Sequence, residues 1–350
     1  MYRFFRPIFF IFAPEPIHRI IMLMLGALKF IPWGRRVVKK CCTYRHKSLE
    51  VNVFGITFPN PVGLAAGFDK NAALTDELAC LGFGYVEAGS VTPLAQRGNP
   101  RPRCFRLPKD MAIINRMGFN NKGVEAVAAN LRKRNPKLIV GANIGKNTLT
   151  PNDKAPDDYE KCFVALYPHA DYFVVNVSCP NVSSLRELQD SARLTEIVRR
   201  LTAFRALQPQ RKPILLKLSP DLTPEQIDEA LEVVAGEGLD GVVAANTTTC
   251  RDGLQSPGGK VDGMGNGGLS GAPLTQRALE MVRYISGKTQ GKLPIVGVGG
   301  IMTPQDALNM LRAGASLVQV FTGFIYQGPG FAKKICREIA KKATVKFVGR

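Results

Sequence analysis

The chain has 350 residues, of which 45% are hydrophobic, and it carries a formal net charge of +19 at pH 7. Its eight cysteines form no Cys-x-x-Cys pair, so the sequence predicts neither a zinc site nor a disulfide framework, and reduced thiols in a cytoplasmic compartment are the simpler interpretation. None of the three histidines (His18, His46 and His169) follows a predicted strand, so a metal hydrolase or a Ser-His mechanism lacks its imidazole.

Residues 1–40 predict a small helical domain that is separate from the rest of the chain. Phenylalanine and isoleucine dominate residues 4–12, and residues 15–30 have the apolar spacing of a helix. The uninterrupted apolar run from Ile20 to Leu28 is too short to span a bilayer. Pro7 and Pro14 bracket a very short apolar stretch and no small-residue cleavage site follows, so a signal peptide is rejected.

A basic cluster follows this helix and consists of Arg35, Arg36, Lys39, Lys40, Arg45 and Lys47. An apolar helix beside basic residues favours a monotopic anchor on an anionic membrane surface. The alternative is a helix packed on the rest of the protein and followed by a solvated basic linker. The other basic residues are spread over predicted helices and are not interleaved with aromatic residues, so no nucleic-acid partner is predicted.

Eight short apolar runs follow, and nearly all end in glycine or a polar residue: residues 61–67, 85–92, 139–145, 172–178, 214–219, 241–247, 295–300 and 317–322. Segments of helical character lie between them, including residues 76–81, 124–134, 192–207, 224–236 and 304–313. Thr223 and Thr303 each precede a proline in the pattern of a helix N-cap. Eight strand-then-helix units with strands apolar on both faces predict a parallel (β/α)8 TIM barrel over residues 41–350.

The stretch from Asn176 to Asn181 (Asn-Val-Ser-Cys-Pro-Asn) places two carboxamides and a thiol where the fourth strand meets its loop. A carboxamide can donate and accept hydrogen bonds to a planar heterocycle at the same time. The thiol of Cys179 can take a proton or attack a carbon atom. A buried cysteine beside turn-forming asparagines is the structural alternative.

The predicted strand ends share the chemistry of a nucleotide cofactor site. Residues 297–300 and Thr322-Gly323 match the phosphate site of barrels, and Ala65-Ala66-Gly67 allow a flat group to approach the backbone. Lys217 lies in an otherwise apolar strand and therefore needs an anionic partner. With the asparagines that end three strands (Asn143, Asn176 and Asn246), these features indicate flavin mononucleotide (FMN), with Lys217 at its N1/O2 edge. Glycolytic-type phosphate substrates would use the same phosphate site.

The sequence resembles the dihydroorotate dehydrogenases over nearly its whole length. The resemblance is carried by residues 65–70 (AAGFDK), 89–93 (GSVTP), 115–121 (NRMGFNN), 143–146 (NIGK), 176–181 (NVSCPN), 246–247 (NT), 267–271 (GGLSG) and 297–300 (GVGG). It implies oxidation of dihydroorotate to orotate with one FMN per chain, in pyrimidine synthesis. Residues 13–18, 101–106 and 184–189 resemble the membrane-associated class 2 enzymes, which pass electrons to quinone. The resemblance thus implies a peripheral membrane protein, expected as a monomer on the cytoplasmic face of a bacterial inner membrane, with residues 1–40 admitting the quinone.

The resemblance also implies roles for individual residues. FMN would contact Ala65, Ala66, Gly67, Lys70, Ser90, Asn143, Asn176, Lys217, Ala245, Gly271, Gly300, Phe321 and Thr322. The substrate would contact Lys70, Asn115, Arg116, Met117, Gly118, Phe119, Asn176, Asn181, Asn246 and Thr247. His18 and Arg106 would lie along the quinone tunnel, and Cys179 would be the catalytic base. Two positions depart from the class 2 pattern, which usually has Ser where this chain has Cys179 and often has Thr where it has Ala245.

A mechanism follows from these roles. Lys70 pairs with the substrate carboxylate, and the asparagines bind the amide edges of the ring. Cys179 removes the C5 proton, which is α to a carbonyl, and the C6 hydride moves to flavin N5. Three alternatives remain open: a soluble class 1-like dihydroorotate dehydrogenase with another acceptor, a tRNA dihydrouridine synthase, which would carry a further RNA-binding domain, and an enzyme like IMP dehydrogenase, which would bind no flavin.

Overall fold

The computed structural model describes residues 2–178 and 191–342. Eight parallel strands form a closed barrel in chain order: β3 (Val62–Leu64), β4 (Tyr85–Val91), β7 (Ile139–Ile144), β8 (Tyr172–Asn176), β9 (Ile214–Leu218), β10 (Gly241–Ala244), β12 (Ile295–Val298) and β13 (Leu317–Val320). The last strand closes the barrel because Val318 pairs with Val62 of β3. The predicted TIM barrel is confirmed, and each observed strand lies within its predicted run.

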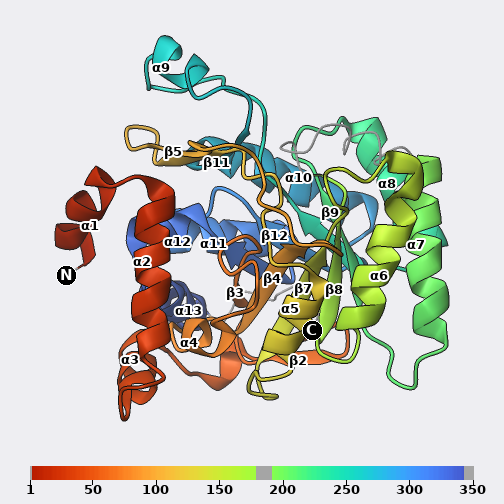
Figure 1. Ribbon diagram of the computed structural model, residues 1–350, viewed down its shortest axis with the longest axis horizontal. Helices are drawn as coiled ribbons and strands as arrows, with labels where there is room; N and C mark the ends of the chain where they lie inside the picture. Colours follow the sequence, from red (N-terminus) through yellow and green to blue (C-terminus); the bar gives the residue numbers. More distant parts are fainter. Residues whose placement is uncertain (1, 179–190, 343–350) are drawn as a thin grey trace.

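Helices surround this barrel (Figure 1): α4 (Thr75–Ala79), α5 (Val124–Leu131), α6 (Ala155–Leu166), α7 (Ser191–Ala206), α8 (Pro224–Gly236), α10 (Thr275–Lys288), α11 (Pro304–Arg312), α12 (Thr322–Gln327) and α13 (Phe331–Lys341). The two predicted caps are confirmed. Thr223 and Thr303 each accept a hydrogen bond from the third helical residue, whose side chain bonds back to the cap. The strands are buried on both faces because the helices cover the outside while side chains fill the inside.

Two small sheets extend the barrel and were not predicted from the sequence. A hairpin of β1 (Val51–Val53) and β2 (Ile56–Phe58) closes the amino-terminal end, where the Phe58 ring lies 5.1 Å from that of Tyr85. An antiparallel sheet of β5 (Cys104–Leu107), β6 (Ala112–Asn115) and β11 (Gly268–Gly271) lies at the opposite end. Short helices complete the fold: η1 (Lys47–Leu49), η2 (Asn152–Lys154), α9 (Gly258–Asp262) and η4 (Ala272–Leu274).

Three helices precede the barrel: α1 (Tyr2–Ile11), α2 (Pro14–Ala27) and α3 (Gly34–Cys42). Figure 1 shows them in red along one side of the molecule, opposite α7. Four of the six residues of the basic cluster lie in α3, and Arg45 and Lys47 follow it. Helix α2 packs on the barrel through the buried side chain of Ile17. In the described part of the chain, no helix is long and apolar enough to cross a membrane.

Candidate active site

A layer of polar side chains crosses the interior of the barrel near the carboxyl ends of its strands. Asn176 of β8 donates from Nδ2 to Ser90 Oγ at 2.9 Å and to Asn143 Oδ1 at 3.2 Å. Ser90 in turn donates to Asn143 Oδ1. These three residues come from neighbouring strands, since β4 pairs with β7 and β7 pairs with β8. The structure therefore brings three of the residues predicted to contact FMN into one hydrogen-bonded cluster.

Lys217 finds its anionic partner in Glu87, which the sequence analysis did not identify. Lys217 Nζ lies 3.8 Å from Glu87 Oε1, and both side chains are buried. The Glu87 carboxylate also accepts hydrogen bonds from Asn143 Nδ2 at 2.8 Å and from Gln319 Nε2 at 2.6 Å. The signal was present in the sequence, because a glutamate inside the apolar run of residues 85–91 needs a partner as much as a lysine inside residues 214–218 does.

A second cluster lies at the ends of β8 and β10. Asn246 donates from Nδ2 to Ser178 Oγ at 3.1 Å and to Asn176 Oδ1 at 3.4 Å. The backbone N–H of Thr247 donates to Asn246 Oδ1 at 2.9 Å. Ser178 is a second residue that the sequence analysis missed, although it directly precedes Cys179. Cys179 and Asn181 lie outside the described residues.

Glycines shape the rim of the barrel beside these clusters. Gly67 has φ +102°, and a Cβ there would lie 3.3 Å from the ring of Phe321. Gly300 has φ +66°, and a Cβ there would lie 2.1 Å from Thr275 Cα. The remaining predicted FMN contacts are Ala65 and Ala66 after β3, Ala245 after β10, Gly271 at the end of β11, and Thr322, whose hydroxyl lies 2.8 Å from that of Ser270. The positive φ of Gly67 and Gly300 favours glycine at both positions.

The donor chemistry of the interior layer fits FMN. The interior layer supplies amide groups that both donate and accept, which suits the polar edge of a flavin ring, and the buried ammonium of Lys217 suits its negative charge on reduction. At Gly300 the backbone of Thr275 occupies the position that a Cβ would take, so this turn needs glycine for packing. Within the described ranges, no group of three His, Cys, Asp or Glu side chains could hold a metal ion.

Five of the predicted substrate residues, 115–119, run from the last residue of β6 into the loop that follows it. Lys70 donates from Nζ to Asn120 Oδ1 beside this loop. Asn115 lies at its start and donates to the Gly268 carbonyl at 3.5 Å, while the Phe119 side chain is buried at its end. Arg116 turns toward β5, where its Nη2 donates to the Pro102 carbonyl at 3.1 Å. The carbonyls of Met117 and Gly118 accept hydrogen bonds from residues 96–99, so these residues take part through the main chain.

His18 and Arg106 both lie between the N-terminal helices and the barrel. His18 Nε2 donates to the Phe68 carbonyl at 3.0 Å, and burial lowers the pKa of this imidazole. Arg106 Nη1 donates to the Phe12 carbonyl at 2.7 Å, and its guanidinium lies 4.6 Å from the centroid of the Phe10 ring. Burial also lowers the pKa of Arg106. Aromatic rings meet beside both residues: the His18 ring lies 4.9 Å from that of Phe68, and the Phe10 ring lies 5.1 Å from that of Tyr326.

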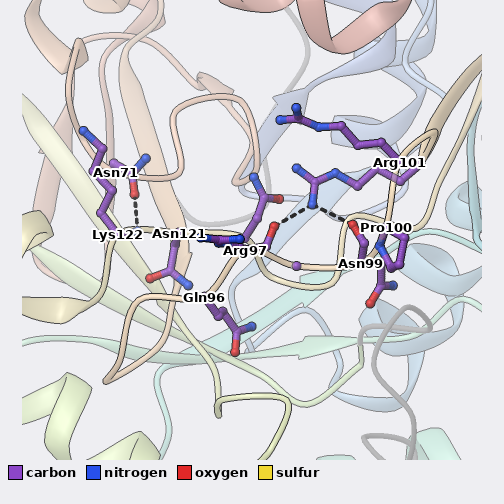
Figure 2. A pocket seen from close by; sticks show the side chains of 11 residues that line it. Asn71, Gln96, Arg97, Asn99, Pro100, Arg101, Asn121 and Lys122 are labelled. Carbon is purple, nitrogen blue, oxygen red and sulfur yellow. Dashed lines mark hydrogen bonds between the residues drawn. The ribbon is translucent and has the colours of Figure 1, made fainter.

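A polar cavity of about 630 Å³ opens beside the residue 115–119 loop (Figure 2). It is lined by Asn71, Gln96, Arg97, Gly98, Asn99, Pro100, Arg101, Arg103, Asn120, Asn121 and Lys122. Asn120, one of the lining residues, accepts a hydrogen bond from Lys70 Nζ. No residue predicted as a substrate or FMN contact lines this cavity.

Comparisons with known proteins agree with this geometry. The family model described as dihydroorotate dehydrogenase matches residues 48–343. A relative from Christiangramia forsetii, described as dihydroorotate dehydrogenase (quinone), is 49% identical over 96% of this chain and 98% of its own. A relative of the same description from Gloeobacter violaceus is 46% identical over 98% of this chain and 94% of its own. The crystal structure of ligand-free DHODH from Eimeria tenella superposes with a TM-score of 0.85 at 36% identity, over 96% of this chain and 97% of that one.

Proposed function

The chain belongs to the dihydroorotate dehydrogenase family, and from that premise we propose that it oxidises dihydroorotate to orotate in pyrimidine biosynthesis and passes the electrons to a membrane quinone. The observation that carries the proposal is the buried layer of Asn143, Asn176 and Lys217 near the strand ends. Glu87 neutralises the charge of Lys217. Such a layer offers paired donors and acceptors and one cation to a flat, electron-accepting ring.

FMN is the cofactor that this layer supports, one per chain. When bound, FMN accepts the hydride that leaves C6 of the substrate and later gives up two electrons. Lys217 and the asparagines would hold its ring, and the rim at Gly300 and Thr322-Gly323 would hold its phosphate through backbone N–H groups. Gly67 would lie against the flat face of the ring.

The chain's own groups would bind and activate dihydroorotate. Lys70 would pair with its carboxylate, and Asn115, Asn176 and Asn246 would bind its amide edges. Cys179 would take the C5 proton as general base. Asn246 already donates to Ser178, the residue that precedes Cys179 in the sequence, and would hold an amide edge of the ring.

Membrane association is supported by the surface of the N-terminal helices. Large apolar side chains stand exposed there, at Phe4, Phe5, Ile8, Ile11, Phe12, Ile20, Leu23, Met24, Phe30, Ile31 and Trp33. Arg36, Lys39 and Lys40 lie on the adjoining α3. An apolar surface flanked by cations suits an anionic bilayer. We place the enzyme on the cytoplasmic face of a bacterial inner membrane, as a monomer, with quinone entering past His18 and Arg106.

The test is spectroscopic and structural. Purified protein should show flavin absorbance, and anaerobic dihydroorotate should bleach it in one turnover without quinone. A tRNA dihydrouridine synthase would keep its flavin oxidised under dihydroorotate, and an enzyme like IMP dehydrogenase would be colourless. A crystal structure with the flavin phosphate away from Gly300 and Thr322, or no flavin under saturating FMN, contradicts the proposed site. Turnover with a soluble acceptor but not with quinone would favour a class 1-like enzyme.

A further inference from the structure

Residues 96–103, named here the brace, run alongside the substrate loop (residues 115–119) and are bonded to it. Gln96 and Asn121 exchange two backbone hydrogen bonds of 3.0 and 3.1 Å. Asn99 donates from its backbone N–H to the Met117 carbonyl at 3.1 Å and from Nδ2 to the Arg116 carbonyl at 3.0 Å. The two segments are in close contact: a Cβ on Gly98 would lie only 2.2 Å from the Met117 carbonyl oxygen. The brace therefore determines where the substrate loop lies.

The carboxamide of Gln96 holds the end of the loop against the barrel. Its Nε2 donates to the carbonyls of Gly118 and Phe119, both at 3.1 Å, while its Oε1 accepts from Asn147 Nδ2 at 2.9 Å. Phe119 has φ +50°, a backbone conformation that is unfavourable for a residue with a side chain. Such a turn persists only where its surroundings hold it, and Gln96 supplies two of the bonds that do so.

The other end of the brace is fixed by the N-terminal helix α2. The buried guanidinium of Arg103 donates from Nη1 to the Arg97 carbonyl at 2.6 Å and to the Asn99 carbonyl at 3.0 Å. Its remaining nitrogens bind the carboxylate of Glu15 at 2.9–3.2 Å. Burial raises the pKa of Glu15, but the Arg103 hydrogen bond and the nearby cations outweigh it and hold that pKa below its usual value. The ionised carboxylate of Glu15 on α2 thus orients Arg103, whose guanidinium binds the carbonyls of two other residues of the brace.

We propose that Glu15 and Gln96 are positioning residues for dihydroorotate, acting through the brace on the substrate loop; this rests on the proposed function. Removing the Glu15 charge leaves a buried guanidinium without its counterion, which is strongly unfavourable. Arg103 then turns toward solvent and releases the carbonyls of Arg97 and Asn99. The substrate loop populates other conformations, and the apparent affinity falls in proportion to the fraction that remains competent. A helix of the membrane-facing domain thereby supports substrate binding.

The experiment compares Glu15→Gln and Gln96→Ala with Arg101→Gln in the purified holoenzyme, without quinone or lipid. Arg101 is the matched control: it also pairs with Glu15, at 3.3 Å, but its side chain is 70% exposed. Orotate affinity is measured by calorimetry, and flavin reduction by dihydroorotate in single turnovers. We expect the dissociation constant for orotate to rise about five- to fiftyfold in both test variants, the usual range for coupled sites. Arg101→Gln should stay within about twofold, as expected for an exposed pair.

The outcomes separate the possibilities. Wild-type affinity for orotate in both test variants overturns the proposed positioning role. A loss of thermal stability with unchanged affinity overturns it too, because it marks a merely structural role. Unchanged orotate affinity with a raised KM for quinone, measured in a separate steady-state assay, restricts the effect of Glu15 to the N-terminal helices and also overturns the proposal. If Glu15→Gln fails to fold, Gln96→Ala decides alone, because the ion pair stays intact in that variant. Wild-type protein that binds no orotate contradicts the proposed function instead.

Discussion

Glu87 and Lys217 are opposite charges enclosed in the barrel interior, on β4 and β9, and each is the other's ion-pair partner. Taking either charge out of water costs several kcal/mol unless the other offsets it. The same carboxylate accepts hydrogen bonds from Asn143 and Gln319, so four strands depend on one residue. We therefore regard Glu87 as part of the framework that sets the position of the flavin contacts.

Removal of one charge should be worse than removal of both. Glu87→Gln and Lys217→Met should each lower the free energy of unfolding by about 3–5 kcal/mol, because each leaves a buried unpaired charge. The double variant should lose clearly less than the sum of the two. Urea unfolding of all four proteins at one fixed FMN concentration measures this coupling. Strictly additive losses would show that the two charges do not stabilise each other.

Cys179 is the second residue whose role can be tested alone. Cys179→Ala removes the proposed proton acceptor, so flavin reduction should slow roughly 10²–10⁴-fold, the usual contribution of a general base. FMN content and orotate binding should change little. Cys179→Ser keeps an acceptor that is harder to deprotonate than a thiol of pKa near 8.5, so its pH–rate profile should move to higher pH. Single-turnover rates against pH decide, and near wild-type rates in the Ala variant would mark Cys179 as a packing residue.

At the scale of elements, α1 and α2 combine one face packed on the barrel with another that is apolar and exposed. Leu23 is 69% exposed on α2, and Leu207 is 83% exposed just after α7. Helices α2 and α7 lie on opposite sides of the molecule (Figure 1). Exposed single hydrophobic residues are ordinary, whereas a contiguous group is typical of an interaction surface. The two leucines therefore form a matched pair for testing membrane contact.

Leu23→Glu should weaken sedimentation with anionic vesicles about tenfold, because a carboxylate at this depth meets both an apolar phase and negative lipid charge. Leu207→Glu, with the same change in charge, should bind as the wild type does. Binding of all three proteins should fall as salt is added, because the cations of α3 are screened. Equal losses in the two variants would mean that net charge, and not α2, determines binding.

The contact of α2 with the barrel should weaken in acid. Burial lowers the pKa of His18 in the folded protein, with Lys70 lowering it further and the Phe68 carbonyl and Glu15 opposing the shift. The unfolded chain binds a proton below its ordinary pKa of about 6.5, while the folded protein does not, so stability falls as the pH drops through that value. Above it, both states are neutral and His18 adds no pH dependence.

His18→Gln keeps a donor for the Phe68 carbonyl and removes the titration. The difference in unfolding free energy between wild type and variant should therefore be flat above about pH 7 and should shift in favour of the variant toward pH 5. Urea denaturation at several pH values measures it. A constant difference across this range would show that His18 does not titrate on unfolding.

For the whole molecule, we expect the N-terminal helices to serve the quinone half-reaction and the barrel to serve the dihydroorotate half-reaction. Deleting residues 1–30 should abolish reduction of a long-chain quinone, while flavin reduction by dihydroorotate stays measurable. The dihydroorotate half-reaction should nevertheless need more substrate, because Glu15 is lost with the helices and Arg103 is left without its counterion. Stopped-flow and steady-state assays separate the two effects. Full turnover with long-chain quinone in the truncated enzyme would contradict the division.

The sequence by itself determined the barrel, because strand and helix signals are local: all eight apolar runs became strands, and both Thr-Pro caps formed. It also showed that Lys217 required an anion. Only the tertiary structure decided which one, because closing the barrel brings Glu87 and Gln319 together across 232 residues. The Glu15–Arg103 pair, 88 residues apart, and the sheet of β5, β6 and β11 have the same origin. Hydrogen bonds and ion pairs between distant segments depend on chain packing, which no local pattern of residues encodes.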